Sequence, residues 1–141
     1  MLDYLNIFTD GGARGNPGPA ATGVFITDRQ GKKVTGFGKK IGRATNNVAE
    51  YKAVISALDW IVKNKSNLAD NVQIYFNMDS NLVYSQLSGF FKIKNAELRN
   101  LFFMIKQKEA EIKIPIHYSY VRREKNIQAD KYVNQALDTE E

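Results

Sequence analysis

The sequence of 141 residues contains no cysteine and no apolar run long enough to cross a membrane. Without cysteine the protein has no disulfide, no thiolate metal ligand and no cysteine nucleophile. Its N-terminus, Met1 to Tyr4, lacks the basic and apolar regions of a secretory signal, and no later stretch approaches the ~18 apolar residues of a membrane span. We therefore expect a soluble cytoplasmic protein without a membrane partner.

Histidine is nearly absent as well, and this disfavours one class of enzyme. The single histidine, His117, lies among alternating apolar residues, where a packed or partly exposed ring is expected. A Ser-His-Asp hydrolase would depend wholly on it. The glycine-rich segment Gly11 to Pro19 lacks the Gly-Lys-Ser/Thr ending of a phosphate-binding P-loop and does not match G-x-G-x-x-G, so the sequence gives no support for either nucleotide-binding motif.

The composition favours one basic globular domain. Twenty Lys and Arg residues against fifteen Asp and Glu give a formal net charge of +5 and a pI near 9.4, which favours polyanionic partners without choosing among them. The length and the 43% apolar content suit a single hydrophobic core. Because repeats, low-complexity segments and linkers are all absent, we expect one domain over residues 1–141.

Five stretches have the composition and alternation of β-strands: residues 5–10, 22–27, 33–39, 72–78 and 112–120. The first three, separated by short turns, predict an antiparallel meander. We expect the first strand to end at Asp10 and the fourth to run directly into Asp79. The fifth contains Pro115, which cannot donate to a ladder, so we expect it near a sheet edge.

Four stretches have apolar residues at helical spacing: residues 47–62, 80–87, 96–109 and 127–137. We expect Asn46 or Asn47 to cap the first helix, with Glu50 in its first turn. Asp130 would lie in the first turns of the last helix, which the acidic tail Asp138 to Glu141 follows.

Four carboxylates, Asp10, Glu50, Asp79 and Asp130, therefore occupy strand ends and helix starts, where a sheet and its covering helices can bring them together. Such a cluster is costly unless cations neutralise it, and oxygen ligands suit Mg²⁺ or Mn²⁺. Two ions about 3.5–4 Å apart can activate a water and stabilise the leaving oxygen of a phosphodiester. Each carboxylate alone could equally be a turn former or a helix cap, so spacing alone does not establish a site.

The local sequence around the four carboxylates favours a common site over four separate turn or cap residues. The segments are TDGGARGNPGP (Thr9–Pro19), TNNVAE (Thr45–Glu50), MDSNLV (Met78–Val83) and EKNIQAD (Glu124–Asp130). In this order they resemble the type 1 ribonucleases H, and the resemblance extends from Phe8 to Leu137. The combination of T-D-G-x-x-x-G-N-P-G-P with T-N-N-x-x-E is highly specific.

The resemblance implies an α/β fold with a mixed five-stranded sheet flanked by helices, in which strands 1 to 3 are antiparallel and strands 4 and 5 run parallel to strand 1. It also implies an endoribonuclease that hydrolyses the RNA strand of RNA–DNA hybrids by two-metal-ion catalysis. Water attacks in line and leaves a 5′-phosphate and a 3′-hydroxyl. The family's two Mg²⁺ ions, which Mn²⁺ can replace, and its catalytic roles are carried onto Asp10, Glu50, Asp79 and Asp130.

The same resemblance assigns hybrid binding. Candidates for reading the minor groove are Asn16, Asn46, Asn47 and Asn81, with backbone groups near Gly12 and Ala13. This is physically reasonable because the wide minor groove displays the 2′-hydroxyls of RNA, one of which Glu50 can bind. Arg43 and Thr45 match a pocket that grips a phosphate of the DNA strand. The alternative for Arg43 is an exposed loop charge.

The sequence departs from many family members at two places. A Gly-His loop before the last carboxylate is replaced by Val121 to Asn126, as in a shorter subgroup, and Arg123 or Glu124 could take part of the histidine's role; a salt-bridged turn is the alternative. The connection Ser88 to Asn95 replaces a longer basic protrusion. Substrate binding would then depend more on nearby basic and aromatic side chains, unless the rings belong to the core: Phe90, Phe91, Lys92, Lys94 and Arg99.

Two other functions fit the sequence less well. A non-catalytic hybrid-binding module would keep the basic surface and lose a carboxylate, whereas all four carboxylates are present. A ribonuclease H domain of a reverse transcriptase would be fused to a polymerase, whereas this sequence begins with Met1 and ends just after the last expected helix. We expect the protein to act on its RNA–DNA hybrid as a monomer.

Overall fold

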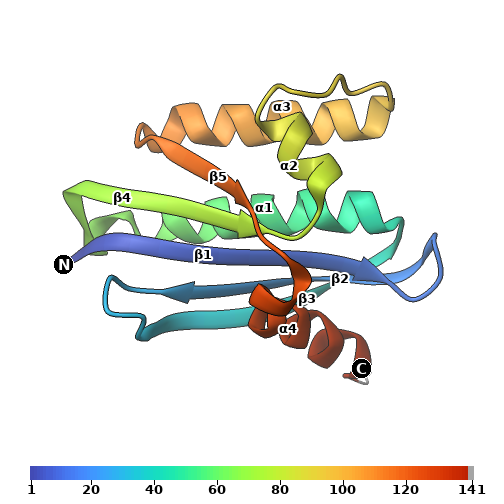
Figure 1. Ribbon diagram of the computed structural model, residues 1–141, viewed down its shortest axis with the longest axis horizontal. Helices are drawn as coiled ribbons and strands as arrows, with labels where there is room; N and C mark the ends of the chain where they lie inside the picture. The colour runs from blue at the N-terminus through green and yellow to red at the C-terminus, as the bar shows by residue number, and fades with distance from the viewer. Residues whose placement is uncertain (140–141) are drawn as a thin grey trace.

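The computed structural model describes residues 1–139 and has a five-stranded sheet at its centre (Figure 1). The strand order is β3-β2-β1-β4-β5, with β1 antiparallel to β2, β2 antiparallel to β3, β4 parallel to β1 and β5 parallel to β4. This arrangement confirms the predicted mixed sheet and the edge position of β5. The strands are β1 (Leu2–Ala13), β2 (Gly18–Thr27), β3 (Lys33–Ala44), β4 (Leu68–Met78) and β5 (Ile116–Tyr120).

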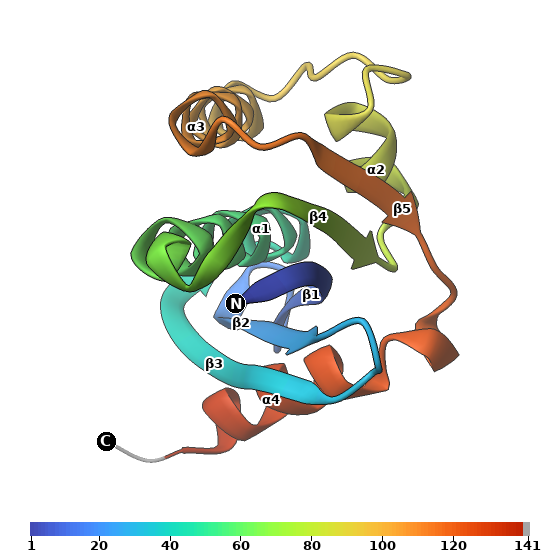
Figure 2. The same cartoon turned by 90° about the vertical axis from the view of Figure 1, so that its left-hand side faces the viewer.

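Helices cover both faces of the sheet. They are α1 (Asn46–Lys63), α2 (Asn81–Leu87), α3 (Ala96–Ile112) and α4 (Ile127–Asp138), with short 3-10 helices at Lys65–Asn67 and Arg123–Lys125. Figure 2 shows α1 and α4 on opposite faces of the sheet, and α3 packed on the outer side of α1. Within residues 1–139, none of these helices is both long and apolar enough to span a membrane.

The core lies between the sheet and α1, because both elements present their apolar side chains to this layer. Burying one large apolar side chain, such as Leu or Phe, contributes about 1.5–3 kcal/mol to the free energy of unfolding. On the other face α4 approaches the backbone of β2 at Gly23, where a Cβ atom would lie 2.1 Å from the carbonyl oxygen of Ala129. The fully buried side chains of the core include Leu5, Ile7, Val24, Ile26, Tyr51, Val54, Leu58, Ile61, Ile74 and Phe76.

The prediction that the first strand ends at Asp10 was wrong. β1 continues to Ala13, because Gly11 and the two residues after it pair with β2, from Gly11 opposite Thr22 to Ala13 opposite Ala20. The glycines suggested a turn, but they extend the hairpin instead. Asp10 therefore lies inside a paired strand, which holds its backbone more firmly than a loop would.

Other boundaries differ from the prediction as well: β2 begins four residues earlier, at Gly18, β3 extends to Ala44 and β4 begins at Leu68. The apolar alternation from Ile112 onward predicted one strand, yet α3 ends at Ile112 and is capped by Lys113, which has a left-handed φ of 61°. Ile112 is buried as the last residue of a helix, and β5 starts only after Pro115. The cap of α1 is Thr45, whose hydroxyl accepts a hydrogen bond from the Val48 amide at 3.2 Å, and neither asparagine next to it takes that role.

The last predicted helix is confirmed with a boundary one residue later, at Asp138. The acidic tail that follows it in the sequence lies partly outside the described residues, since Glu140 and Glu141 are beyond them.

Candidate active site

Three carboxylates from three elements converge at the carboxyl end of β1 and β4. Asp10 lies on β1 and Asp79 directly after β4. Glu50 is the fifth residue of α1, in the second turn and not in the first turn as predicted. One carboxylate oxygen of each lies within 4.8 Å of the others. The parallel pairing of Thr9 with Met78 places Asp10 beside Asp79, because Asp10 follows Thr9 and Asp79 follows Met78. We call these three residues the carboxylate cluster.

Two members of the cluster are buried, Asp79 is half-buried, and the negative charges of the three repel one another. Asp10 and Glu50 are only 7% and 8% exposed. Burial, and then the charge of Asp79, raises the pKa of Asp10 from 3.8 to about 7, and burial together with Asp10 raises the pKa of Glu50. Burial also raises the pKa of Asp79. For Asp10 and Glu50, burial and the neighbouring carboxylates act in the same direction, so three negative charges in this volume are disfavoured.

The donor set fits divalent metal ions. All three groups offer carboxylate oxygen, the ligand that hard cations such as Mg²⁺ and Mn²⁺ prefer, and a cation would replace their mutual repulsion with attraction. Asp10 and Glu50 project from a strand and a helix of the core, so the protein itself holds the oxygens together. The residues present are therefore compatible with the metal use predicted from the sequence.

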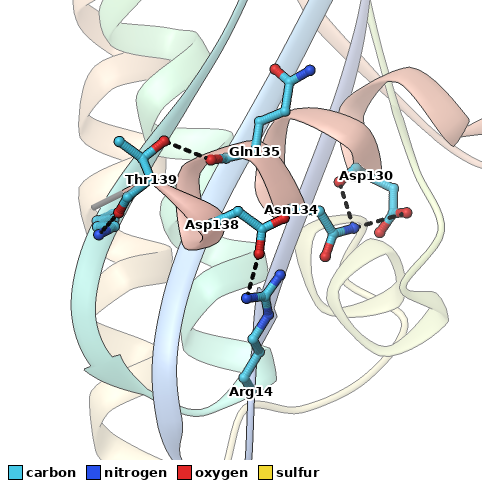
Figure 3. Close-up of polar contacts among 7 residues, drawn as sticks. Arg14, Asp130, Asn134, Gln135, Asp138 and Thr139 are labelled. Atoms are coloured by element: carbon cyan, nitrogen blue, oxygen red, sulfur yellow. Dashed lines mark hydrogen bonds and ion pairs between the residues drawn. The ribbon is translucent and has the colours of Figure 1, made fainter. Parts of the chain in front are cut away.

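Asp130, the fourth predicted carboxylate, lies at the rim of the same cleft. It is the fourth residue of α4 and is exposed, and the Asn134 amide donates hydrogen bonds to its carboxylate at 3.3 Å and to its backbone carbonyl at 3.1 Å (Figure 3). Its charge contributes to the raised pKa of Asp10. It faces a cleft of about 490 Å³, the carboxylate cleft, which all four predicted carboxylates line.

Asn126 also belongs to the site, although the sequence gave it no role of its own. It is buried, and its side-chain amide donates a hydrogen bond to the Thr9 carbonyl at 2.9 Å. A hydrogen bond from the same side chain acts to lower the pKa of Asp79. Asn126 thereby ties the start of α4 to β1 beside Asp10. The only signal in the sequence was its position in the EKNIQAD segment.

Asn46 joins the glycine-rich hairpin to the start of α1. Its side-chain oxygen accepts a hydrogen bond from the Ala13 amide at 2.8 Å, and its own amide donates to the Asn16 side chain at 3.0 Å. Gly12, Ala13, Asn46 and Asn47 all line the carboxylate cleft. The structure therefore gathers most of the predicted minor-groove residues on one wall.

The remaining predicted substrate residues lie outside that lining. Asn81 is exposed at the start of α2. Arg43 is exposed at the end of β3, where it lines a separate hollow with Pro19 and Leu137. The hydroxyl of Thr45 accepts the capping hydrogen bond at the start of α1. Their roles toward a substrate stay predictions from the sequence.

Comparison with known proteins agrees with this geometry. Residues 8–136 match the family described as reverse transcriptase-like. The chain is 41% identical to LC11-RNase H1, a protein isolated from compost, and the two structures superpose with a TM-score of 0.89 over 95% of this chain and 96% of that one. The chain belongs to the type 1 ribonuclease H family. This confirms the family predicted from the sequence.

Two further members show the same relationship. RNase H1 from the archaeon Halobacterium salinarum is 33% identical, with a TM-score of 0.85 over 96% of this chain and 98% of that one. The bifunctional protein Rv2228c of Mycobacterium tuberculosis is 40% identical over 133 residues. These residues are 94% of this chain and 35% of that protein, so the chain spans about a third of the length of this curated relative.

Among type 1 ribonucleases H, this chain has a short segment before the last carboxylate, and the structure separates its two candidate helpers. Arg123 lines the carboxylate cleft, and its charge acts to lower the pKa of Asp79. Glu124 instead lines a small hollow with Phe8 and Phe25. Neither residue forms an ion pair within residues 1–139, so the alternative of a salt-bridged turn finds no support in the described part of the chain.

The α2–α3 connection is the second departure. Phe90 and Phe91 are 71% and 48% exposed, so these rings are surface and not core. Lys92 and Lys94 are exposed beside them. His117 is exposed and stacks on Tyr75 with ring centroids 5.0 Å apart, which agrees with the packed or partly exposed ring expected for it.

Proposed function

We propose that the protein is an endoribonuclease that hydrolyses the RNA strand of RNA–DNA hybrids and leaves 5′-phosphate and 3′-hydroxyl ends. The convergence of Asp10, Glu50 and Asp79 within 4.8 Å carries the proposal, because a buried carboxylate cluster suits metal-assisted phosphodiester hydrolysis. LC11-RNase H1, a family member with 41% identity, was solved in complex with an RNA/DNA hybrid, which supports the substrate.

Two Mg²⁺ ions, which Mn²⁺ can replace, would be held by Asp10, Glu50, Asp79 and Asp130. When bound, such ions activate a water for in-line attack and stabilise the leaving oxygen. The protein's own contribution is to fix these carboxylates on β1, β4, α1 and α4. Asn126 and Asn134 hold the backbone near Asp10 and the carboxylate of Asp130 in place.

Recognition of the RNA strand is assigned to the wall beside the cluster. The hydrogen bond that Asn46 accepts from Ala13 and the one that it donates to Asn16 order this wall before substrate arrives, which reduces the entropy lost on binding. Glu50 would accept a hydrogen bond from a 2′-hydroxyl, the group that distinguishes RNA from DNA. Asn47 and Asn81 would contact the minor groove, and Arg43 with Thr45 a phosphate of the DNA strand. The cytoplasmic location and monomeric state stay predictions from the sequence.

A substrate panel tests the proposal. Each strand of an RNA–DNA hybrid and of a DNA duplex of the same sequence is labelled and incubated with the protein and Mg²⁺. We expect cleavage of the RNA strand alone, with 5′-phosphate on the downstream product. Hybrid binding without cleavage would favour a binding module instead, and cleavage of the DNA duplex at a similar rate would contradict a 2′-hydroxyl requirement.

A further inference from the structure

Arg14 lies at the mouth of the carboxylate cleft, one residue beyond the end of β1. It lines the cleft together with the four predicted carboxylates. Its backbone amide donates a hydrogen bond to the Pro19 carbonyl at 2.8 Å, which closes the base of the glycine-rich loop. The loop therefore fixes the point from which the Arg14 side chain projects. Neither the family motif nor the proposed function gives this side chain a role.

The charges of the cleft single out Arg14. Among residues 1–139, its lining includes four carboxylates but only two cationic side chains, Arg14 and Arg123. Arg123 acts electrostatically on Asp79, a member of the cluster. Arg14 is instead paired with Asp138 in the last turn of α4, at 2.7 Å (Figure 3). Asp138 does not belong to the cleft lining, so the Arg14 pairing leaves the carboxylate cluster untouched.

The chain directly after Asp138 has contacts that do not involve Arg14. Lys40 of β3 donates a hydrogen bond from its ammonium group to the Thr139 carbonyl. The Thr139 hydroxyl donates to the Gln135 carbonyl at 2.7 Å (Figure 3). The end of α4 is therefore anchored to β3 by a contact that does not involve Arg14. Removing the Arg14 side chain should leave this helix end in place.

The Arg14–Asp138 pair is weak enough to be exchanged. The two side chains are 49% and 64% exposed, and ion pairs at such positions contribute little because water solvates both charges. A phosphodiester offers two oxygens to the guanidinium fork, as a carboxylate does, so it can form charge-assisted hydrogen bonds of the same kind with Arg14. A nucleic-acid phosphate that reaches the cleft mouth can replace Asp138 at small cost.

We infer that Arg14 is a phosphate-binding residue of the hybrid cleft, and that Asp138 competes with the phosphate for its guanidinium group. The inference rests on the proposed function, since it assumes that a duplex lies over the carboxylate cluster. Arg14 is four residues beyond Asp10, about 13 Å along an extended chain. It is thus placed for a backbone phosphate that flanks the one being cut. By this competition, Asp138 slightly lowers the affinity of the protein for the hybrid.

Four variants test the inference: Arg14→Gln, Arg14→Lys, Asp138→Asn and the double variant Arg14→Gln/Asp138→Asn. KM and kcat are measured with a labelled hybrid in Mg²⁺, and Kd for the same hybrid in EDTA, where cleavage is not needed. We expect Arg14→Gln to raise KM and Kd roughly fivefold to tenfold with kcat little changed, and Arg14→Lys to restore much of the affinity. The slope of log Kd against log salt should become shallower by about one for Arg14→Gln.

Asp138→Asn should lower KM and Kd about twofold to threefold, because the phosphate no longer competes with a carboxylate. In the Arg14→Gln background the same substitution should have no effect. Asp3→Asn is the matched control. Asp3 pairs with Arg29 at 3.5 Å, with both side chains about half exposed, near the opposite end of β1. Asp3→Asn changes the net charge by the same amount as Asp138→Asn and should leave KM and Kd unchanged.

Three results would overturn the inference. The first is unchanged KM and Kd in Arg14→Gln, and the second is equal effects of Asp138→Asn and Asp3→Asn. The third is a joint loss of kcat and melting temperature in Arg14→Gln, which would indicate a structural role. Failure of the proposed function has a different signature. In that case Kd would still depend on Arg14, while no variant, nor the wild type, would cleave RNA in Mg²⁺.

Discussion

Gly11 lies directly against the backbone of Glu50. A Cβ atom on Gly11 would lie 2.4 Å from the Glu50 amide nitrogen and 2.2 Å from the carbonyl carbon of Ala49, well inside van der Waals contact. α1 can come this close to β1 only because residue 11 has no side chain. Since Asp10 precedes Gly11, the same approach brings the carboxylates of Asp10 and Glu50 together.

Gly11→Ala should therefore damage both the fold and the site. The added methyl group meets backbone atoms that cannot rotate away, so α1 must shift. We expect a loss of about 1–3 kcal/mol in the free energy of unfolding, and a fall in cleavage rate on the order of 10²-fold from displaced carboxylates. Urea unfolding and kcat measure the two effects. Wild-type stability and rate in this variant would show that the close approach is unimportant.

Gly12→Ala is the control for stability. A Cβ atom on Gly12 would meet only a methyl carbon of Val133, at 3.6 Å, which is an ordinary contact. Its free energy of unfolding should stay within about 0.5 kcal/mol of wild type. If Gly12→Ala lost as much free energy of unfolding as Gly11→Ala, the cause would be a change in the β1–β2 hairpin and not the contact with α1.

Asp10→Asn should make the metal-free protein more stable at pH 8. The pKa of Asp10 is raised from 3.8 to about 7, mainly by burial and then by Asp79, so the folded state binds this proton more tightly than the unfolded chain. The stability from that proton is complete below pH 3.8 and is lost as the pH rises through about 7. In EDTA we expect the variant to melt several degrees above wild type at pH 8, and the difference to shrink at pH 5. A difference that grows toward low pH would contradict this account.

Magnesium should reverse that order at pH 8. An ion that binds only the folded state stabilises it in proportion to the logarithm of its concentration above Kd. We expect Mg²⁺ to raise the melting temperature of the wild type, and to have much less effect on Asp10→Asn, whose cluster has one charge fewer. Equal shifts in both proteins would place the bound ion elsewhere.

Arg123→Ala and Glu124→Ala should differ, although the sequence offered both residues as helpers. Arg123 lines the carboxylate cleft beside Asp79, whereas Glu124 lines another hollow. We expect Arg123→Ala to lower kcat on the order of 10²-fold with a smaller change in KM, and Glu124→Ala to keep a rate near wild type. Steady-state cleavage and melting curves for the pair provide the test. An equal fall in kcat in both variants, or no fall in either, would contradict a specific role of Arg123 in the reaction.

The sequence predicted the parts of this molecule that depend on local patterns. Alternation and helical spacing located the strands and helices, and the four motifs brought the carboxylates to one site. The predicted boundaries were wrong where the same sequence pattern is compatible with two structures. The glycines after Asp10 suggested a turn but extend β1, and Ile112 suggested the start of a strand but is the last residue of α3.

Contacts between distant segments were not predictable in the same way. The bond from Asn126 to Thr9 joins residues 117 positions apart, and the Arg14–Asp138 pair spans nearly the whole chain. Neither leaves a periodic signal, because each depends on how α4 packs on the sheet. The separation of Arg123 from Glu124 depends on the course of a short turn, which side-chain chemistry alone does not determine.

The most direct test of the account is cleavage of one RNA–DNA hybrid, labelled on both strands, first in excess EDTA and then after Mg²⁺ is added in excess over the chelator. The account predicts an intact hybrid in EDTA and, after Mg²⁺, cleavage of the RNA strand alone by the wild type and none by Asp10→Asn. RNA cleavage that proceeds in EDTA, or at a comparable rate in Asp10→Asn with Mg²⁺, would contradict it.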